Sequence, residues 1–321
     1  MAQAKGSKAR ILGGVKEVTY NTTPNIAGGS TINLPFMSSS IRGSSNLIKS
    51  KVLKGRRDDV APSQGNISVA GTVVIPVDQA NIGYWLQMLL GDPVSTGNSA
   101  PYTHVFDIPD SLDSWVLEHG YTDNGDYQLF NGCKAKSMSF EFGGDGELSA
   151  SVEIVGGKET TGTSSMDSGT PTSVTLTPYS FKHLAAKEGG SPIATLLSAS
   201  LTISNELDES QYLIGASGYR GSLPEGKCVV SGNIKAIFED WTLYGKASAG
   251  TESSLQFTLT NGAYSLDILM QEVIFGQNAP AIDTPGGIYI DLPFQAYFDN
   301  AAQDKTGVQV TLVNTLAAYI S

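Results

Sequence analysis

Residues 65–75 read GNISVAGTVVI, and this stretch decides the fold. Four apolar residues in it alternate with small or polar ones: Ile67, Val69, Val73 and Ile75. Such a period of two is typical of a β-strand with one buried face. The whole chain has 36 Gly and only 16% charged residues, a composition that favours short strands and turns over long helices. The sequence therefore predicts a mainly β fold.

The pattern occurs twice along the chain. Residues 65–75 align with residues 226–236 at a shift of 161, and residues 115–154 align with residues 255–294 at a shift of 140. The difference between the shifts indicates a net insertion of 21 residues in the first half, near residues 92–101. Because the matched segments keep their order and their apolar phase, we interpret the chain as an internal duplication.

The segment between the two copies has the composition of a linker. Residues 157–173 are rich in Gly, Ser and Thr and contain few apolar residues. We therefore expect an N-terminal arm over residues 1–35, a first β domain over residues 36–156 and a second over residues 174–321. Each domain is expected to be a β-sandwich or barrel, because its strands are short and follow one another closely.

One short helix is expected in each half. In the first half Asp78 provides an N-cap and Gly91 a C-terminal stop. The apolar residues between them share one face at helical spacing: Ile82, Trp85, Leu86 and Leu89. The corresponding segment of the second half, residues 240–250, is expected to form only a turn or two.

Charge is distributed unevenly along the chain. The net charge is −11, yet residues 1–57 carry ten of the 20 Lys and Arg residues and one acidic residue, Glu17. A basic segment on an acidic body could attract nucleic acid or the acidic body of a neighbouring copy, or it could simply be solvated.

The residues that usually carry chemistry are few and scattered. The three histidines, His104, His119 and His183, have neither metal-ligand spacing nor an acidic partner at a motif distance. Cys133 and Cys228 cannot form a disulfide framework and are interpreted as small, half-buried strand residues. We therefore predict no catalytic residue, no cofactor and no metal site.

Two short motifs are better explained as turns. Gly215-Ala216-Ser217-Gly218 resembles a nucleophile elbow, but Tyr219 stands where the last glycine is needed. Asp123-Asn124-Gly125-Asp126 lacks the spaced acids and closing Glu of a calcium loop, and it suits a hairpin.

Neither a membrane segment nor an export signal is evident in the sequence. No apolar stretch approaches the roughly 20 residues of a membrane span. Residues 1–10 are basic but lack the apolar core of a signal peptide, so the expected site of folding is a cytoplasm.

The order of these features over residues 40–315 resembles that of phage tail tube proteins. The resemblance in the first half rests on residues 65–72, Leu89-Leu90-Gly91 and Gly132-Cys133-Lys134. In the second half it rests on residues 199–205, 231–234 and 238–240 and on Leu312-Val313-Asn314. These motifs are strand patterns rather than reactive groups.

The resemblance implies two tandem tail-tube-like domains whose sheets join edge to edge around a channel. A six-domain ring is typical of the family, so we expect three chains in each ring, with a hexamer as the second choice. It further implies a non-enzymatic virion tail protein assembled in the host cytoplasm. Its partners would be its own copies, the tail tip or baseplate and the tail terminator, and phage DNA would pass through without specific binding.

Tube proteins also carry a long arm between two early strands that reaches the next ring. By position this arm corresponds to residues 49–64, with residues 204–225 as the counterpart in the second half. The resemblance thus places five basic residues at a contact between rings: Lys49, Lys51, Lys54, Arg56 and Arg57.

Three other kinds of protein are consistent with the same pattern. A baseplate ring, a capsid decoration protein or a secretion-system tube would be a similar β-rich component. A carbohydrate-binding β-sandwich would need exposed aromatic residues on one face. A jelly-roll hydrolase would need histidines or paired acids that converge in space.

Overall fold

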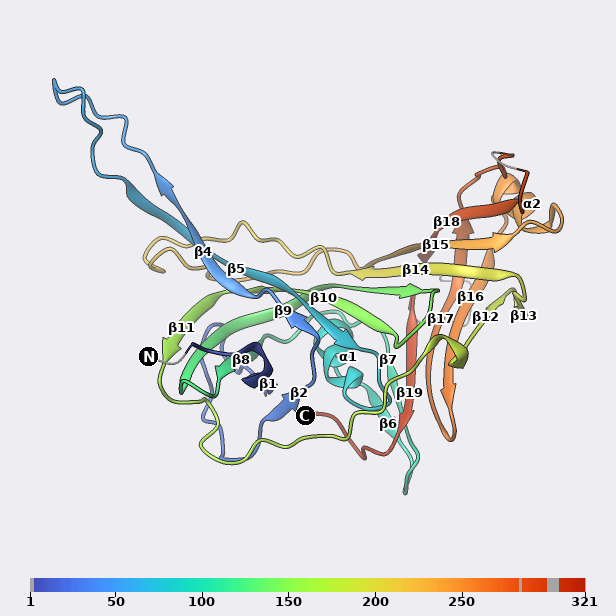
Figure 1. Ribbon diagram of the computed structural model, residues 1–321, viewed down its shortest axis with the longest axis horizontal. Coiled ribbons are helices and arrows are strands. Elements are labelled where there is room, and N and C mark those ends of the chain that lie inside the picture. The colour runs from blue at the N-terminus through green and yellow to red at the C-terminus, as the bar shows by residue number, and fades with distance from the viewer. Residues whose placement is uncertain (1–2, 283–284, 299–305, 321) are drawn as a thin grey trace.

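A computed structural model of the chain describes residues 3–282, 285–298 and 306–320. Antiparallel β-strands form most of it, and the two halves of the chain lie side by side (Figure 1). The mainly β fold predicted from the sequence is confirmed. Among the described residues the α-helices are α1 (Ile82–Leu90) and α2 (Thr242–Ala249), one in each half. Neither is long and apolar enough to cross a membrane.

The first half contains β1 to β11 and a 3₁₀ turn, Gly6–Lys8. The strands are β1 (Ala9–Lys16), β2 (Ile32–Leu34), β3 (Ser38–Ser39), β4 (Arg42–Ile48), β5 (Ser63–Pro76), β6 (Val94–Thr96), β7 (Tyr102–Phe106), β8 (Trp115–Tyr121), β9 (Asp126–Phe142), β10 (Ser149–Gly156) and β11 (Lys158–Gly162).

The second half contains a 3₁₀ turn, Phe181–His183, and the remaining strands. These are β12 (Leu184–Glu188), β13 (Ser191–Pro192), β14 (Leu196–Ser204), β15 (Val229–Ile237), β16 (Ser253–Asn261), β17 (Tyr264–Phe275), β18 (Tyr289–Tyr297) and β19 (Gln309–Asn314).

The long strand β9 belongs to two sheets. Its first part pairs with β8 and β11, and its second part pairs with β10 and β14. Gly132 lies where the strand passes from one sheet to the other, with a φ of 65° that L side chains rarely adopt. A Cβ atom there would lie 2.5 Å from Oδ1 of Asn21, so this crossing point requires glycine.

Strand pairing repeats between the halves with the shifts found in the sequence. Val73 of β5 pairs with Val152 of β10. Adding 161 and 140 to these numbers gives Ile234 and Leu292, which pair between β15 and β18. Strands β5, β10, β9 and β8 thus correspond to β15, β18, β17 and β16.

The two halves share a sheet and a hydrophobic core. Residues 199–204 of β14 pair with residues 137–142 of β9, so the strand order β4–β5–β10–β9–β14–β15–β18–β17 is unbroken. We call this the eight-strand run. Phe142 stacks on Phe257 across the junction, with ring centroids 4.9 Å apart. Buried residues of both halves form one continuous cluster.

Residues 157–173, expected to be a linker, include β11 and are tied to the first half. The buried carboxylate of Asp167 accepts hydrogen bonds from the backbone of Gly29, Thr31 and Gly169. Burial alone would raise the pKa of Asp167, but these hydrogen bonds outweigh it and hold the pKa well below its usual range.

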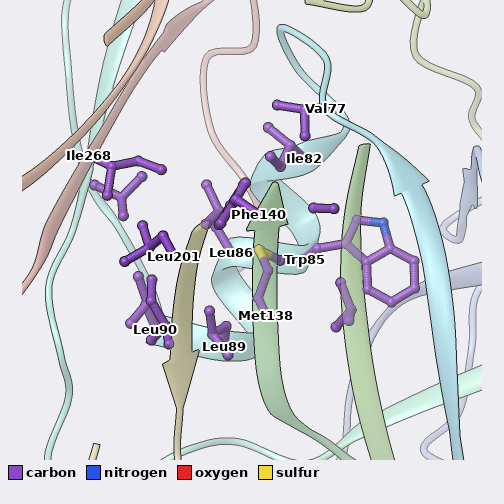
Figure 2. Close-up of a cluster of buried hydrophobic side chains, with 14 of the residues drawn as sticks. Val77, Ile82, Trp85, Leu86, Leu89, Leu90, Met138, Phe140, Leu201 and Ile268 are labelled. Atoms are coloured by element: carbon purple, nitrogen blue, oxygen red, sulfur yellow. The ribbon is translucent and has the colours of Figure 1, made fainter. Parts of the chain in front are cut away.

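The helix α1 ends at Gly91 as the sequence predicts, but it begins at Ile82, with Asn81 rather than Asp78 at the N-cap position. The Asp78 carboxylate accepts hydrogen bonds from the backbone N–H groups of Asn81 (3.1 Å) and Ile82 (2.9 Å), and Gly91 ends the helix with a φ of 73°. Its surroundings differ from the prediction, because every residue of α1 is buried rather than one face. Figure 2 shows α1 surrounded by residues of both halves, with Met138 and Phe140 from the first and Leu201 and Ile268 from the second.

We expect Leu201→Ala to lower the free energy of unfolding by about 2–5 kcal/mol, because it leaves a cavity between the two halves. Leu201 is fully buried, whereas Leu197 on the same strand is 45% exposed. Urea unfolding followed by circular dichroism measures both variants, and the control Leu197→Ala should change stability by roughly 0.5 kcal/mol or less. Equal losses for the two variants would contradict a core shared across β14.

Candidate assembly surfaces

A long hairpin projects from the first half and carries the predicted basic residues. Residues 44–67, which we call the first arm, comprise the end of β4, the connecting loop and the start of β5, and they extend away from the body (Figure 1). All five predicted contact residues lie exposed on this arm: Lys49, Lys51, Lys54, Arg56 and Arg57.

The charges of the first arm are largely unpaired within the chain. Arg56 forms an ion pair with Asp58 at 2.5 Å, and both side chains are exposed, so the pair adds little stability. Among the residues that the structure describes, the other four basic residues of the arm form no ion pair. Apolar side chains are exposed beside them: Leu47, Ile48, Val52 and Leu53.

The corresponding hairpin of the second half lies on the molecule instead. A shift of 161 relates the first arm to residues 205–228, which we call the second arm. Leu207 and Leu223 of this arm are buried against Val155 of β10, in a small cluster separate from the main core. Ion pairs flank the cluster, with Lys134 Nζ 2.8 Å from Glu225 Oε2 and Lys136 Nζ 3.0 Å from a Glu209 oxygen.

Arg220 fastens the second arm to the first half. Its side chain is almost fully buried, and its Nη1 donates hydrogen bonds to the carbonyl oxygens of Val69 (3.2 Å) and Gly156 (3.0 Å). Its Nη2 donates to Ser68 Oγ at 2.9 Å and to Glu209 Oε2 at 3.1 Å. Sequence reasoning missed this residue, although Arg220 is the only arginine after residue 57.

The eight-strand run has two open ends. At one end β4 pairs with β5 and with no other strand among the described residues. At the other end β17 stops at Phe275, but the chain continues beside β18, where Gly276 N donates to Pro293 O at 2.7 Å and Asn278 Nδ2 to Asp291 O at 2.8 Å. Residues 277–282 are mostly exposed and form no regular structure.

The histidines and cysteines are surrounded by packing and hydrogen-bonding partners. His104 is buried between Ser95 Oγ and the carbonyl oxygen of Leu316, and burial lowers the pKa of His119 to about 4. Burial also raises the pKa of Cys133 above its usual range and that of Cys228 to about 11. Within the described ranges no three His, Cys, Asp or Glu side chains cluster as metal ligands would.

We expect Arg220→Met to release the second arm, because the carbonyl groups of Val69 and Gly156 lose a buried donor, at a cost of about 1–3 kcal/mol for each group left unsatisfied. Limited proteolysis with mass spectrometry should find cleavage within residues 205–228 at least about tenfold faster. Lys227→Met, on the same arm but exposed, is the control and should cleave like the parent protein. An unchanged pattern for Arg220→Met would show that the arginine does not hold the arm.

Comparison with known proteins identifies a family from sequence. A profile of the phage tail tube protein family matches residues 6–296. No curated protein matches the chain. The match covers nearly the whole chain, including both halves of the eight-strand run, both arms and both helices, and so agrees with the resemblance seen in the strand patterns. The chain belongs to the phage tail tube protein family.

Proposed function

We propose that this chain polymerises into the stacked rings of a phage tail tube, with three chains and six repeats in each ring. The observation that carries the proposal is the junction between β9 and β14, because it joins one repeat to the next inside a single chain. A true hexamer is the second choice. The tube would conduct DNA during ejection and would be assembled in the host cytoplasm.

The ends of the eight-strand run match the two sides of that junction. Strand pairing relates residues 199–204 of β14 to residues 39–44 at the β4 end of the run by a shift of 160, and shifting residues 137–142 forward by 140 gives residues 277–282 at the β17 end. A second chain could therefore add residues 39–44 to residues 277–282 in the antiparallel register of the internal junction. A head-to-tail contact of this kind closes a ring when the rotation from one chain to the next is a whole fraction of 360°. Both open edges of each run are then paired with neighbouring chains.

The face of the run opposite the core suits a channel for DNA. It is rich in hydroxyl groups near the junction, where Ser139 Oγ and Thr202 Oγ1 lie 3.0 Å apart. We propose that this polar part of the face, beside the junction, lines the channel. The net charge of −11 would repel phosphate rather than bind it, so DNA could pass without specific contacts. The channel ends would meet the tail tip or baseplate and the tail terminator.

The first arm would link one ring to the next. Its basic tip, with Arg56 and Arg57, projects away from the body and could reach the acidic surface of a copy in the adjacent ring. In this proposal the protein is structural, and the scattered histidines, the buried Cys133 and the half-buried Cys228 support no catalytic role.

A cysteine pair tests the proposed junction between chains. In the proposed register Ser44 of one chain lies opposite Gln277 of the next, and both residues are exposed. Cross-strand Cβ atoms lie about 4.5–5.5 Å apart, within reach of a disulfide. We expect the double variant Ser44→Cys with Gln277→Cys to form, on oxidation, a covalent ladder that ends at three chains.

Each single variant, and the off-register pair Ser44→Cys with Ala281→Cys, should form no ladder. A ladder ending at six would favour the hexamer. Rings that form without any cross-link in the registered pair would contradict the proposed strand pairing.

Charge reversal tests the contact between rings. We expect Arg56→Glu with Arg57→Glu to leave rings intact but to shorten tubes severely in physiological salt, as measured by negative-stain microscopy. The control reverses two exposed lysines on the second half, Lys182→Glu with Lys187→Glu, and should give tubes of normal length. Tubes of undiminished length from the arginine variant would refute the role of the arm tip.

A further inference from the structure

The second half has an open apolar groove on the face of the sheet opposite the core. It is lined by Ser231, Ile274, Phe275, Pro293, Phe294 and Tyr297, which belong to β15, β17 and β18. Ile274 is 40% exposed although its neighbours Val273 and Phe275 are buried. Exposed clusters of apolar side chains mark surfaces of interaction, so we expect another segment to bind over this groove.

The same site of the first half is already covered. Shifts of 161 and 140 relate Ser231, Pro293 and Gln295 of the groove region to Ala70, Glu153 and Val155. Val155 is fully buried although it points away from the main core, because Leu207 and Leu223 of the second arm pack on it. The covered site thus shows which kind of segment the open groove accepts, namely an arm.

The first arm is the matching segment. It connects the strands that correspond to those flanking the second arm, yet its side chains Leu47, Ile48, Val52 and Leu53 are exposed. It cannot reach the groove of its own chain, because β4 and β18 lie at opposite ends of the molecule (Figure 1). The occupant must therefore come from a second copy.

Side-chain chemistry distinguishes the two sites. In the covered site Lys134 pairs with Glu225 and Lys136 pairs with Glu209. In the open groove the two lysines become Ile274 and Gly276. In the first arm Glu225 becomes Gln64, and Glu209 becomes Lys49, because strand pairing relates β4 to β14 by a shift of 160. Neither ion pair of the covered site can therefore form between the first arm and the open groove.

The remaining charges of the arms reinforce this distinction. The first arm carries five basic and two acidic residues, whereas the second carries two basic and four acidic residues. Lys134 and Lys136 would repel the first arm from the covered site, while the groove strands contribute Glu272 and Asp291. Such repulsion favours correct pairing of each arm with its site.

We infer that the groove between β15, β17 and β18 of one copy binds the stem of the first arm, residues 46–53, of a second copy. This inference rests on the proposed assembly of copies into rings. Docking of the stem leaves Arg56 and Arg57 free at the tip for a contact between rings. The first arm of one copy then covers the groove of another copy, as the second arm covers Val155 within one chain.

Cross-linking between two labelled proteins tests this contact directly. Ile48→Cys protein is mixed with Ile274→Cys protein under assembly conditions and treated with a short bis-maleimide. We expect a covalent heterodimer. The matched control uses Ile237→Cys, whose side chain is 43% exposed on β15 of the same half, and should give none. Each single variant alone reports any reaction of the native cysteines.

A second variant measures the effect of the groove on assembly. We expect Ile274→Asp to raise the protein concentration needed for assembly by about tenfold or more, because a charge would be buried under the arm. Ile237→Asp should assemble like the parent protein, and circular dichroism should show both variants folded.

The outcomes separate this inference from the function on which it rests. Rings or tubes that form without the heterodimer, and with Ile274→Asp assembling normally, would overturn the docking of the arm and leave the tube intact. Failure of the parent protein to form any ring would overturn both.

Discussion

The pairing of β14 with β9 is the contact on which the rest of the structure depends. It joins residues 199–204 to residues 137–142, turns two repeats into one sheet and lets one hydrophobic core extend through both halves. The helix α1 packs against this junction, and Asn205 just beyond β14 donates hydrogen bonds to the carbonyl oxygens of Leu89 and Ala135, both at 3.0 Å. The junction therefore fixes helix, sheet and second arm relative to one another.

A junction between two repeats of the same fold carries information about assembly. The segments that correspond to the two sides of this junction lie at the two ends of the run, and neither pairs with a further strand among the described residues. The same holds for the arms, one of which is docked while the other extends into solvent. In both cases the chain contains its own example of the contact that it would make with a second copy. Closed rings satisfy all these surfaces at once, whereas an isolated chain leaves them exposed.

Much of the fold could be predicted from local pattern, because strand alternation and helix punctuation are local. Residues 65–75 form most of β5, Gly91 ends α1 as expected, and the Asp78 carboxylate accepts hydrogen bonds from the first turn of the helix although Asn81 is at the N-cap position. The complete burial of α1 could not be predicted, because its far side is covered by Tyr319, whose hydroxyl donates to the carbonyl oxygen of Ala80 from 239 residues away. Composition likewise gave no sign that Asp167 anchors the segment expected to be a linker.

The candidate site could also be predicted only in part. The position and charge of the first arm followed from sequence and family resemblance, since a run of bases between two strands is visible without a structure. The groove could not be foreseen, because Ile274 and Pro293 look like ordinary strand residues until the sheet shows that they face away from the core. Arg220 gave little signal, because its partners Val69 and Gly156 are backbone carbonyl groups that any sequence supplies.

The central claim is that copies of the chain join by repeating the internal junction between β9 and β14. An electron cryo-microscopy reconstruction of the assembled protein tests it most directly. The account predicts rings of six repeats in which residues 39–44 of each chain form a ladder with residues 277–282 of the next. Rings whose β4 edges face solvent, or whose chains meet through other surfaces, would contradict it.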